Sequence, residues 1–210
     1  MLAPTDATRA IALELRDARP PTPAGVVALV AARAPRRCTL AGYSMGARLA
    51  LHVALALPER VARLVLVSGS AGIEDAAARA RRRADDDALA ARIAERGLDW
   101  FVEHWRAVEL FAGDPPWVAA AVAQEERRCT PAQLAASLRG FGPGAMAPLW
   151  ERLGELAMPV AVLAGERDGR YVEQGRRLAA AIPAARLQIV PGAGHRLALE
   201  APGAVAAALR

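Results

Sequence analysis

The sequence predicts an α/β fold, in which a mostly parallel sheet with crossover helices carries a helical insertion. Apolar runs rich in branched residues alternate with helix-favouring stretches at both ends of the chain, a pattern typical of buried parallel strands. Only amphipathic helical patterns occur between residues 72 and 157. With 210 residues and 54% hydrophobic content, the chain can bury one full core. We therefore expect a single domain over residues 1–210, with a helical cap inserted at 72–157.

The segment before the insertion reads as strands and helices in alternation. Residues 10–15 are predicted to form a short strand, and residues 24–34 a helix that ends at Pro35. The apolar run 38–41 is a second strand, followed by an alanine-rich helical stretch. Residues 61–67 are a third strand, which turn residues follow at once. The last two strands with the helix between them make a β-α-β unit.

The remaining elements follow in the same way. Five helices are expected in the insertion, over residues 75–95, 98–108, 116–128, 131–139 and 147–155. Strands return at 158–165 and 186–191, with a helix near 173–181 between them and a final helix over 202–209. This order predicts that the chain returns to the sheet after the insertion.

The motif Gly42-Tyr43-Ser44-Met45-Gly46 lies where a strand turns directly into a helix. That context is typical of a nucleophile elbow, in which the serine Oγ is exposed above the sheet. We expect side chains at Gly42 and Gly46 to collide with neighbouring backbone, and Ser44 to be held in a strained conformation. In a chain so rich in glycine and alanine the same motif also arises by chance in loops. The elbow context favours Ser44 as a nucleophile.

Two further residues follow the carboxyl ends of predicted strands, where active-site loops of such sheets converge. Asp168 follows the strand that ends near Gly165, and His195 follows the strand that ends near Val190. A serine needs an imidazole to take its proton, and a carboxylate to fix the tautomer of that imidazole. The chain order Ser44, Asp168, His195 is the order of an α/β-hydrolase triad.

Other residues of the same types are alternatives at this point. Glu166 lies two residues before Asp168 and is an alternative carboxylate. His52 lies inside the helix after the elbow, where a packed or solvated role is expected. His104 lies in the insertion and is a weaker candidate for substrate contact.

Composition excludes several classes of function. The net charge of +5 comes from arginines interleaved with acids along the chain, and lysine and asparagine are absent. Nucleic-acid binding would need a continuous basic stripe with stacking aromatics, so no nucleic-acid partner is expected. Three scattered histidines do not match the ligand spacing of a metal site. We expect neither a metal nor another cofactor.

Cysteine content and the length of the apolar runs predict a cytoplasmic protein that does not enter a membrane. Two cysteines, Cys38 and Cys129, make no disulfide framework, and the first residues lack the pattern of a signal peptide. No apolar run approaches the roughly 18 residues that span a bilayer. The oligomeric state stays open.

The residues quoted above resemble a known family. The segment 42–51, the stretch 69–73 with its arginine-rich continuation, the region of Trp105 and Phe111, and the segment 165–168 are similar to 2-succinyl-6-hydroxy-2,4-cyclohexadiene-1-carboxylate synthase of menaquinone biosynthesis. The similarity runs from about residue 39 to the C-terminus. The elbow indicates only the α/β-hydrolase superfamily, and Arg48 with the pattern of the insertion makes the narrower match.

The resemblance implies a lyase whose triad removes a proton, so that pyruvate is eliminated from a carboxylate-rich small molecule. It assigns substrate binding to Tyr43, Arg48, Arg82 and Trp105. Arg48 also follows Ser44 by one helical turn, so its guanidinium could reach a carboxylate over the nucleophile. The alternatives are a surface role for Arg48 and Arg82, and a packing role for Trp105. A third arginine of the family aligns near Glu126, with Arg127 as its substitute.

Family members also carry earlier strands and a His-Gly loop that supplies one oxyanion donor, neither of which this sequence shows. Residues 11–19 resemble a remnant of that region. The Met45 amide is then the oxyanion donor that remains, and loss of one donor costs about 10²–10³ in rate. Three hypotheses follow: an active synthase, whose start codon lies further upstream or whose missing strands are otherwise replaced, a serine esterase, and a truncated, inactive hydrolase-fold binding module.

Overall fold

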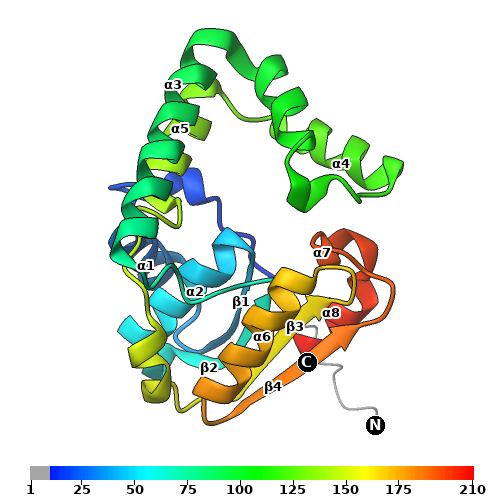
Figure 1. Ribbon diagram of the computed structural model, residues 1–210. Helices are drawn as coiled ribbons and strands as arrows, with labels where there is room; N and C mark the ends of the chain where they lie inside the picture. Colours follow the sequence, from blue (N-terminus) through cyan, green and yellow to red (C-terminus); the bar gives the residue numbers. More distant parts are fainter. Residues whose placement is uncertain (1–9) are drawn as a thin grey trace, which may run out of the picture.

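Four parallel strands form the sheet at the centre of the molecule (Figure 1). The computed structural model describes residues 10–210. Within this part of the chain the strands pair in sequence order, β1-β2-β3-β4, and each pairing is parallel. The strands are β1 Cys38–Tyr43, β2 Val61–Val67, β3 Val160–Gly165 and β4 Ala185–Val190. The predicted α/β fold is confirmed, and the four carboxyl ends lie along one edge of the sheet.

Helices cover both faces of the sheet. Successive β2 side chains point to opposite faces: Leu64 and Leu66 pack in one cluster with α2 and α6, whereas Val65 and Val67 pack with α7 and α8. These four side chains are at most 3% exposed, and each such burial contributes about 1.5–3 kcal/mol. The helices are α1 Pro23–Arg33, α2 Met45–Ala56, α6 Gly169–Ala181, α7 Leu197–Glu200 and α8 Pro202–Ala208.

The strand predicted over residues 10–15 is wrong. The structure has no regular element over residues 10–14 and a short 3-10 helix, η1, at Leu15–Asp17. An apolar run becomes a strand only when a neighbour accepts its hydrogen bonds, and among the described residues the sheet continues from β1 only toward β2. Most side chains of this run are exposed instead.

All regular elements between β2 and β3 are helices. Gly97, with φ of 82°, interrupts the long α3 helix, at the place where the sequence predicts two separate helices. The last predicted helix is instead a 3-10 helix, because Pro148 and Gly154 disfavour α-helix there. The elements are α3 Ala76–Arg106, η3 Glu109–Phe111, α4 Pro116–Glu126, α5 Pro131–Phe141 and η4 Trp150–Glu155.

Side chains at the ends of these helices explain where they begin. The Asp75 carboxylate accepts a hydrogen bond from the Ala78 N–H at 2.7 Å. Thr130 and Gln133 form a reciprocal capping box at the start of α5, which satisfies backbone donors that the helix cannot. α3 and α5 then run side by side (Figure 1), around the apolar residues Ile93 and Phe101.

Near the C-terminus, the predicted final helix is α8, and a short helix that the sequence did not predict, α7, comes before it. α7 and α8 are separated at Ala201, because Pro202 has no N–H to donate and restricts the residue before it. α6 begins earlier than predicted, at Gly169, because the Asp168 side chain caps it.

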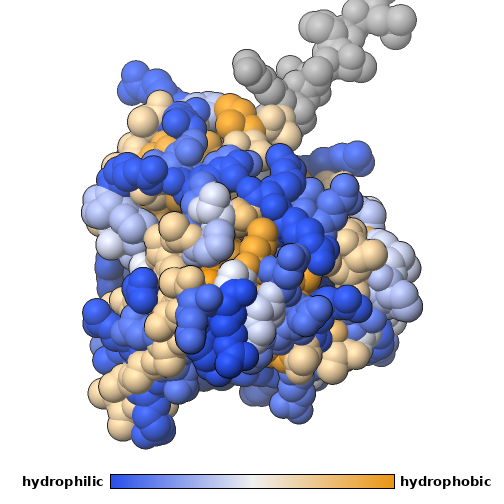
Figure 2. All heavy atoms as spheres, turned by 90° about the horizontal axis from the view of Figure 1, so that it is seen from above, coloured by the Kyte–Doolittle hydropathy of each residue, from blue (hydrophilic) through white to orange (hydrophobic). Residues whose placement is uncertain are grey.

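The surface seen from above is largely hydrophilic, with small separate apolar areas (Figure 2). The large exposed apolar side chains are Ile11, Trp117, Ile189, Leu199 and Leu209, which lie in different elements. Of the helices within residues 10–210, none is both long enough and apolar enough to cross a membrane.

Candidate active site

Ser44 lies on the sharp turn between β1 and α2. Its backbone has φ of 49° and ψ of −109°, a conformation that costs a residue other than glycine about 1–3 kcal/mol. A Cβ on Gly42 would lie 2.2 Å from the carbonyl oxygen of Gly46, so the chain approaches itself too closely there for any side chain. For Gly46 the expectation of a collision is wrong, since a Cβ there would meet no atom beyond its own helix within 4 Å.

Three side chains from three loops meet above the sheet edge. His195 Nε2 lies 3.0 Å from Ser44 Oγ, and His195 Nδ1 lies 2.7 Å from Asp168 Oδ2. The imidazole is 1% exposed and the carboxylate 4%, so water does not compete for these hydrogen bonds. Such a relay allows the imidazole to take a proton from the serine while the carboxylate orients its ring.

The second Asp168 oxygen is also used. Oδ1 accepts a hydrogen bond from the Tyr171 N–H at 3.3 Å, so that the carboxylate caps α6 while its other oxygen faces His195. The alternative carboxylate, Glu166, is placed elsewhere: it is exposed and accepts from the Gly192 N–H at 2.8 Å. Of the two carboxylates, the structure brings Asp168 to the histidine.

Aromatic rings surround the imidazole. The ring centroids of Tyr43, Phe111 and Tyr171 lie 5.4, 5.8 and 4.5 Å from that of His195. Burial raises the pKa of Tyr43, against the opposing charge of Arg196, so this phenol stays neutral. The substrate-binding position predicted for Tyr43 therefore lies against the triad, at the end of β1.

Two residues near the triad were not identified from the sequence. Tyr171 stands three residues after Asp168, the spacing at which a capped helix donates its N–H to the cap. Ser68 is fully buried and donates its hydroxyl to the carbonyl oxygen of His195 at 3.0 Å. Ser68 directly follows β2 and begins the turn sequence Ser68-Gly69-Ser70, at the same sheet edge as the triad. That position is the sequence signal that could have identified it.

Helix α2 begins at Met45, directly after the nucleophile. The N–H groups in the first turn of a helix have no acceptor within it, and they favour negative charge nearby. The Met45 amide, predicted to be an oxyanion donor, thus lies at a helix N-terminus that suits this role.

Arg48 is on the same helix, one turn after Ser44, and is only 8% exposed. Its Nε atom has no hydrogen-bond partner in the part of the chain that the structure describes. Burial lowers the pKa of the guanidinium, the phenol of Tyr171 raises it, and the charge of Arg82 lowers it further. A buried cation with an unused donor is suited to binding an anion.

Arg82 lies on α3, and its side chain is 38% exposed. Its Nε donates to Asp86 Oδ1 at 2.9 Å. The exposure and the pairing leave the other nitrogens of this guanidinium accessible. The end of α5 packs with α2 and approaches Asp86 on α3, which places the two predicted substrate-binding arginines on adjoining parts of these helices.

Trp105 and Arg127 have different surroundings. Trp105 packs against Phe101 at 5.4 Å and Phe111 at 5.5 Å between ring centroids, and Phe111 in turn packs against His195. Arg127 is 53% exposed and pairs with Asp99 at 3.4 Å. Neither residue lines the cavity described next. Their predicted roles in substrate binding remain predictions.

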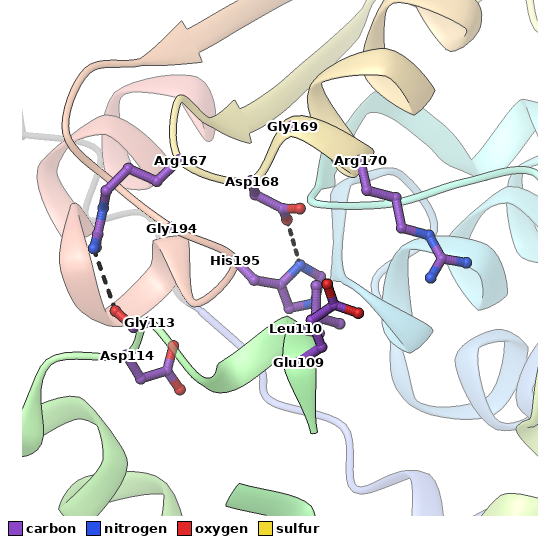
Figure 3. Close-up of a pocket in the computed structure, with 10 residues that line it drawn as sticks. All are labelled: Glu109, Leu110, Gly113, Asp114, Arg167, Asp168, Gly169, Arg170, Gly194 and His195. Atoms are coloured by element: carbon purple, nitrogen blue, oxygen red, sulfur yellow. Dashed lines mark hydrogen bonds and ion pairs between the residues drawn. The ribbon is translucent and has the colours of Figure 1, made fainter. Parts of the chain in front are cut away.

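A cavity of about 300 Å³ lies between the loops after β3 and β4 and the η3 region (Figure 3). The Arg196 Nε pairs with Asp114 at 2.7 Å, and both side chains are nearly buried. Arg167 donates to the Gly113 carbonyl at 3.3 Å. These contacts join the helical segment to the loops of His195 and Asp168. The lining residues are Glu109, Leu110, Gly113, Asp114, Arg167, Asp168, Gly169, Arg170, Gly194 and His195.

The remaining histidine and cysteine side chains have separate surroundings within residues 10–210. No three side chains among His, Cys, Asp and Glu come together there as metal ligands. Cys38 and Cys129 are both free thiols. His52 is partly buried on α2, and burial lowers its pKa, aided by the charges of Arg152 and Arg48.

Comparison with known proteins agrees with this geometry. Residues 2–208 match the alpha/beta hydrolase family. A putative 2-succinyl-6-hydroxy-2,4-cyclohexadiene-1-carboxylate synthase of Bacillus subtilis is 36% identical over 166 residues, which cover 78% of this chain and 61% of the relative. The synthase of Serratia proteamaculans is 33% identical over 175 residues, covering 83% of this chain and 67% of that protein. This chain thus spans about two thirds of the length of these relatives.

A solved structure, MenH from S. aureus, superposes with a TM-score of 0.80 at 31% identity, over 87% of this chain and 70% of that one. The likeness includes sequence as well as fold. The family match extends over nearly the whole chain. The chain therefore belongs to the alpha/beta hydrolase family and is similar to the 2-succinyl-6-hydroxy-2,4-cyclohexadiene-1-carboxylate synthases within it.

Proposed function

We propose that this protein is a lyase of the synthase type, which eliminates pyruvate from a succinyl-cyclohexene carboxylate. The observation that carries the proposal is the hydrogen-bonded series Ser44, His195 and Asp168, with the buried Arg48 one turn beyond the nucleophile. The similarity to the synthases supports the same chemistry. The series alone would also suit hydrolysis, so Arg48 gives the substrate class.

In this proposal the triad acts as a base. His195 accepts the Ser44 proton, and Ser44 Oγ takes a proton from a ring carbon of the substrate. The electron pair of that C–H bond forms the new double bond, the C–O bond to the leaving group breaks, and the leaving group departs as the enolate of pyruvate, which takes the proton from His195 and becomes pyruvate. Asp168 stabilises the imidazolium while it carries the proton.

Negative charge that develops on the substrate needs stabilisation near Ser44. The Met45 N–H and the N-terminus of α2 provide a positive potential at that point. Arg48 provides a full charge where burial keeps water away, and electrostatic interactions are stronger there than in water. A substrate with several carboxylates fits these groups better than a neutral ester.

We further propose that residues 72–157 act as a cap over this site, within one domain. Phe111 packs against His195, and Gly113 and Asp114 line the cavity beside it. The Arg196 pair with Asp114 supports the same role. Tyr43, Arg82 and Trp105 would complete the substrate contacts.

The test is pyruvate release from the pathway substrate by wild type and Ser44→Ala. We expect the variant to lose at least about 10³-fold in kcat. Ser70→Ala, which changes a serine after β2, is the control and should retain activity. Equal rates for wild type and Ser44→Ala would remove the triad from the mechanism.

The second candidate is a serine esterase, because the distances around Ser44 equally suit attack on an ester. It predicts a burst with an activated ester as the acyl-enzyme forms. Esterase turnover that does not depend on Arg48, without pyruvate release, would favour this candidate. Absence of both activities in the folded protein would favour a binding module.

A further inference from the structure

Asp86 is a buried carboxylate that neither the triad nor the predicted substrate contacts include. It lies on α3, is 4% exposed, and accepts from Arg82 Nε at 2.9 Å through Oδ1. Its Oδ2 atom is buried with no hydrogen-bond partner among the described residues. A buried carboxylate oxygen without a partner is costly, so its position calls for a reason beyond packing.

Gly142 creates the space for this carboxylate. A Cβ at residue 142 would lie 2.4 Å from Asp86 Oδ2 and 2.4 Å from the carbonyl oxygen of Leu138. The end of α5 thus approaches α3 closely around the Asp86 side chain. The carboxylate is held by backbone on one side and by Arg82 on the other, with little freedom to turn.

The charges around Asp86 come from both predicted substrate-binding arginines. Burial raises the pKa of Asp86, whereas the hydrogen bond and charge of Arg82, and then the charge of Arg48, lower it, and Asp85 raises it. Arg82 and Arg48 in turn repel each other. Asp86 is therefore the anion that offsets the repulsion between two neighbouring cations.

The hydrogen bond uses only the Nε–H of Arg82. Its two terminal nitrogens make no hydrogen bond to the described residues 10–210, and their paired N–H groups match a carboxylate in a bidentate arrangement. A guanidinium fixed at Nε loses less freedom when it binds a ligand. Asp86 thus determines the direction in which Arg82 presents its remaining donors.

We propose that Asp86 is a positioning residue, which orients Arg82 beside Arg48 so that the two guanidiniums bind two carboxylates of one ligand. This inference rests on the proposed function and adds to it a residue that sets the direction of the Arg82 guanidinium. Asp86 touches no substrate atom and acts through Arg82.

Succinate binding, measured by calorimetry, tests the inference without turnover. We expect Asp86→Asn and Arg82→Met each to weaken succinate binding roughly tenfold. Because Asp86 acts through Arg82, the double variant should bind no more weakly than Arg82→Met alone. Asp87→Asn is the matched control, since Asp87 is the next residue on α3, is half exposed, and pairs only at 3.6 Å with Arg139.

Several results would overturn the inference. Equal succinate binding by Asp86→Asn and Asp87→Asn would exclude a positioning role, and so would additive losses in the double variant. Wild type that does not bind succinate would exclude the two-carboxylate site. Thermal unfolding of each variant shows whether a loss of binding comes from misfolding. If Asp86→Asn misfolds, Arg82→Met tests the same site, because the Arg82 side chain is partly exposed.

The synthase assay separates this inference from the proposed function. If wild type releases pyruvate but KM is the same for Asp86→Asn and Asp87→Asn, the inference fails and the function stands. If wild type binds succinate in the Asp86-dependent manner and releases no pyruvate, the function fails and the inference stands. In the expected case Asp86→Asn raises KM about tenfold and changes kcat less.

Discussion

Two buried polar clusters adjoin the start of α2, and they differ in how completely they are paired. On one side, Asp168 and His195 use their side-chain atoms in hydrogen bonds that end at Ser44. On the other, Arg48 and Asp86 each keep a buried polar atom that has no partner within residues 10–210.

The difference teaches what each cluster contributes. A fully paired network holds its groups in one geometry before the substrate arrives. An unpaired buried polar atom costs about 1–3 kcal/mol in the folded state, and a ligand that supplies the partner recovers this cost. We therefore interpret the triad as preorganised for proton transfer, and Arg48, whose buried Nε–H is an unused donor, as incomplete until an anion binds.

The largest effect is expected from Asp168→Asn. An amide in place of this carboxylate stabilises the wrong tautomer of His195 and not its charged form, so kcat should fall about 10⁴-fold, or ~5.5 kcal/mol. Glu166→Gln changes the exposed carboxylate two residues away and should have little effect. If steady-state kinetics showed similar losses of kcat for the two variants, Asp168 would not be the carboxylate on which catalysis depends.

The next effect concerns the turn that positions both clusters. Gly42→Ala places a Cβ 2.2 Å from the Gly46 carbonyl and should lower the free energy of unfolding by about 2–4 kcal/mol. Gly46→Ala meets no neighbouring atom and should gain up to ~1 kcal/mol as a better helix former. Urea unfolding measures both. Equal losses of unfolding free energy in the two variants would contradict the specific role of Gly42 and would show that both glycines of the motif are needed.

Arg48→Met sharpens the contrast because activity and stability should change in opposite directions. We expect KM for the carboxylate substrate to rise about 10–100-fold, or ~1.4–2.7 kcal/mol. The free energy of unfolding should not fall and should rise by roughly 1 kcal/mol, since a buried cation whose Nε has no partner among the described residues is replaced by an apolar side chain. Arg81→Met, on the exposed side of α3, is the control. A large loss of stability would show that Arg48 is structural.

The smallest effect involves Glu126 on α4, whose Oε2 atom is likewise buried without a partner among the described residues. Burial raises its pKa from 4.5 to about 7, although Arg196, Arg127 and Arg106 oppose the shift. The folded state therefore binds this proton more tightly than the unfolded state between these pH values. Stability from this group is present at low pH and decreases as pH rises from 4.5 to 7.

Because Glu126 is partly solvated, the loss should be only roughly 1 kcal/mol. Urea unfolding at pH 5 and pH 8 should show this decrease in wild type and not in Glu126→Gln. Glu125→Gln removes an exposed carboxylate that pairs with Arg128 and should behave as wild type. The same pH dependence in Glu126→Gln would assign it to another group.

Much of the fold was predictable because its signals are local. Strands β1 to β4 are apolar runs between turn residues, and α5 begins at a capping box that four residues encode. The strand predicted at residues 10–15 failed because pairing depends on a neighbour, which no local pattern specifies. α6 begins before the predicted residue 173 because Asp168 caps it. That capping role can be recognised in the sequence only once the start of the helix is known.

The sequence by itself determined the elbow, the order Ser44, Asp168, His195, and Arg48 one helical turn from the nucleophile, because each depends on short spacing or on strand ends. Only the tertiary structure decided that Asp168 rather than Glu166 reaches His195, that Arg127 lies at the surface, and that Asp86 lies with Arg82 and Arg48. Burial and the approach of distant segments determine those contacts, and neither is a property of a residue's neighbours in the chain.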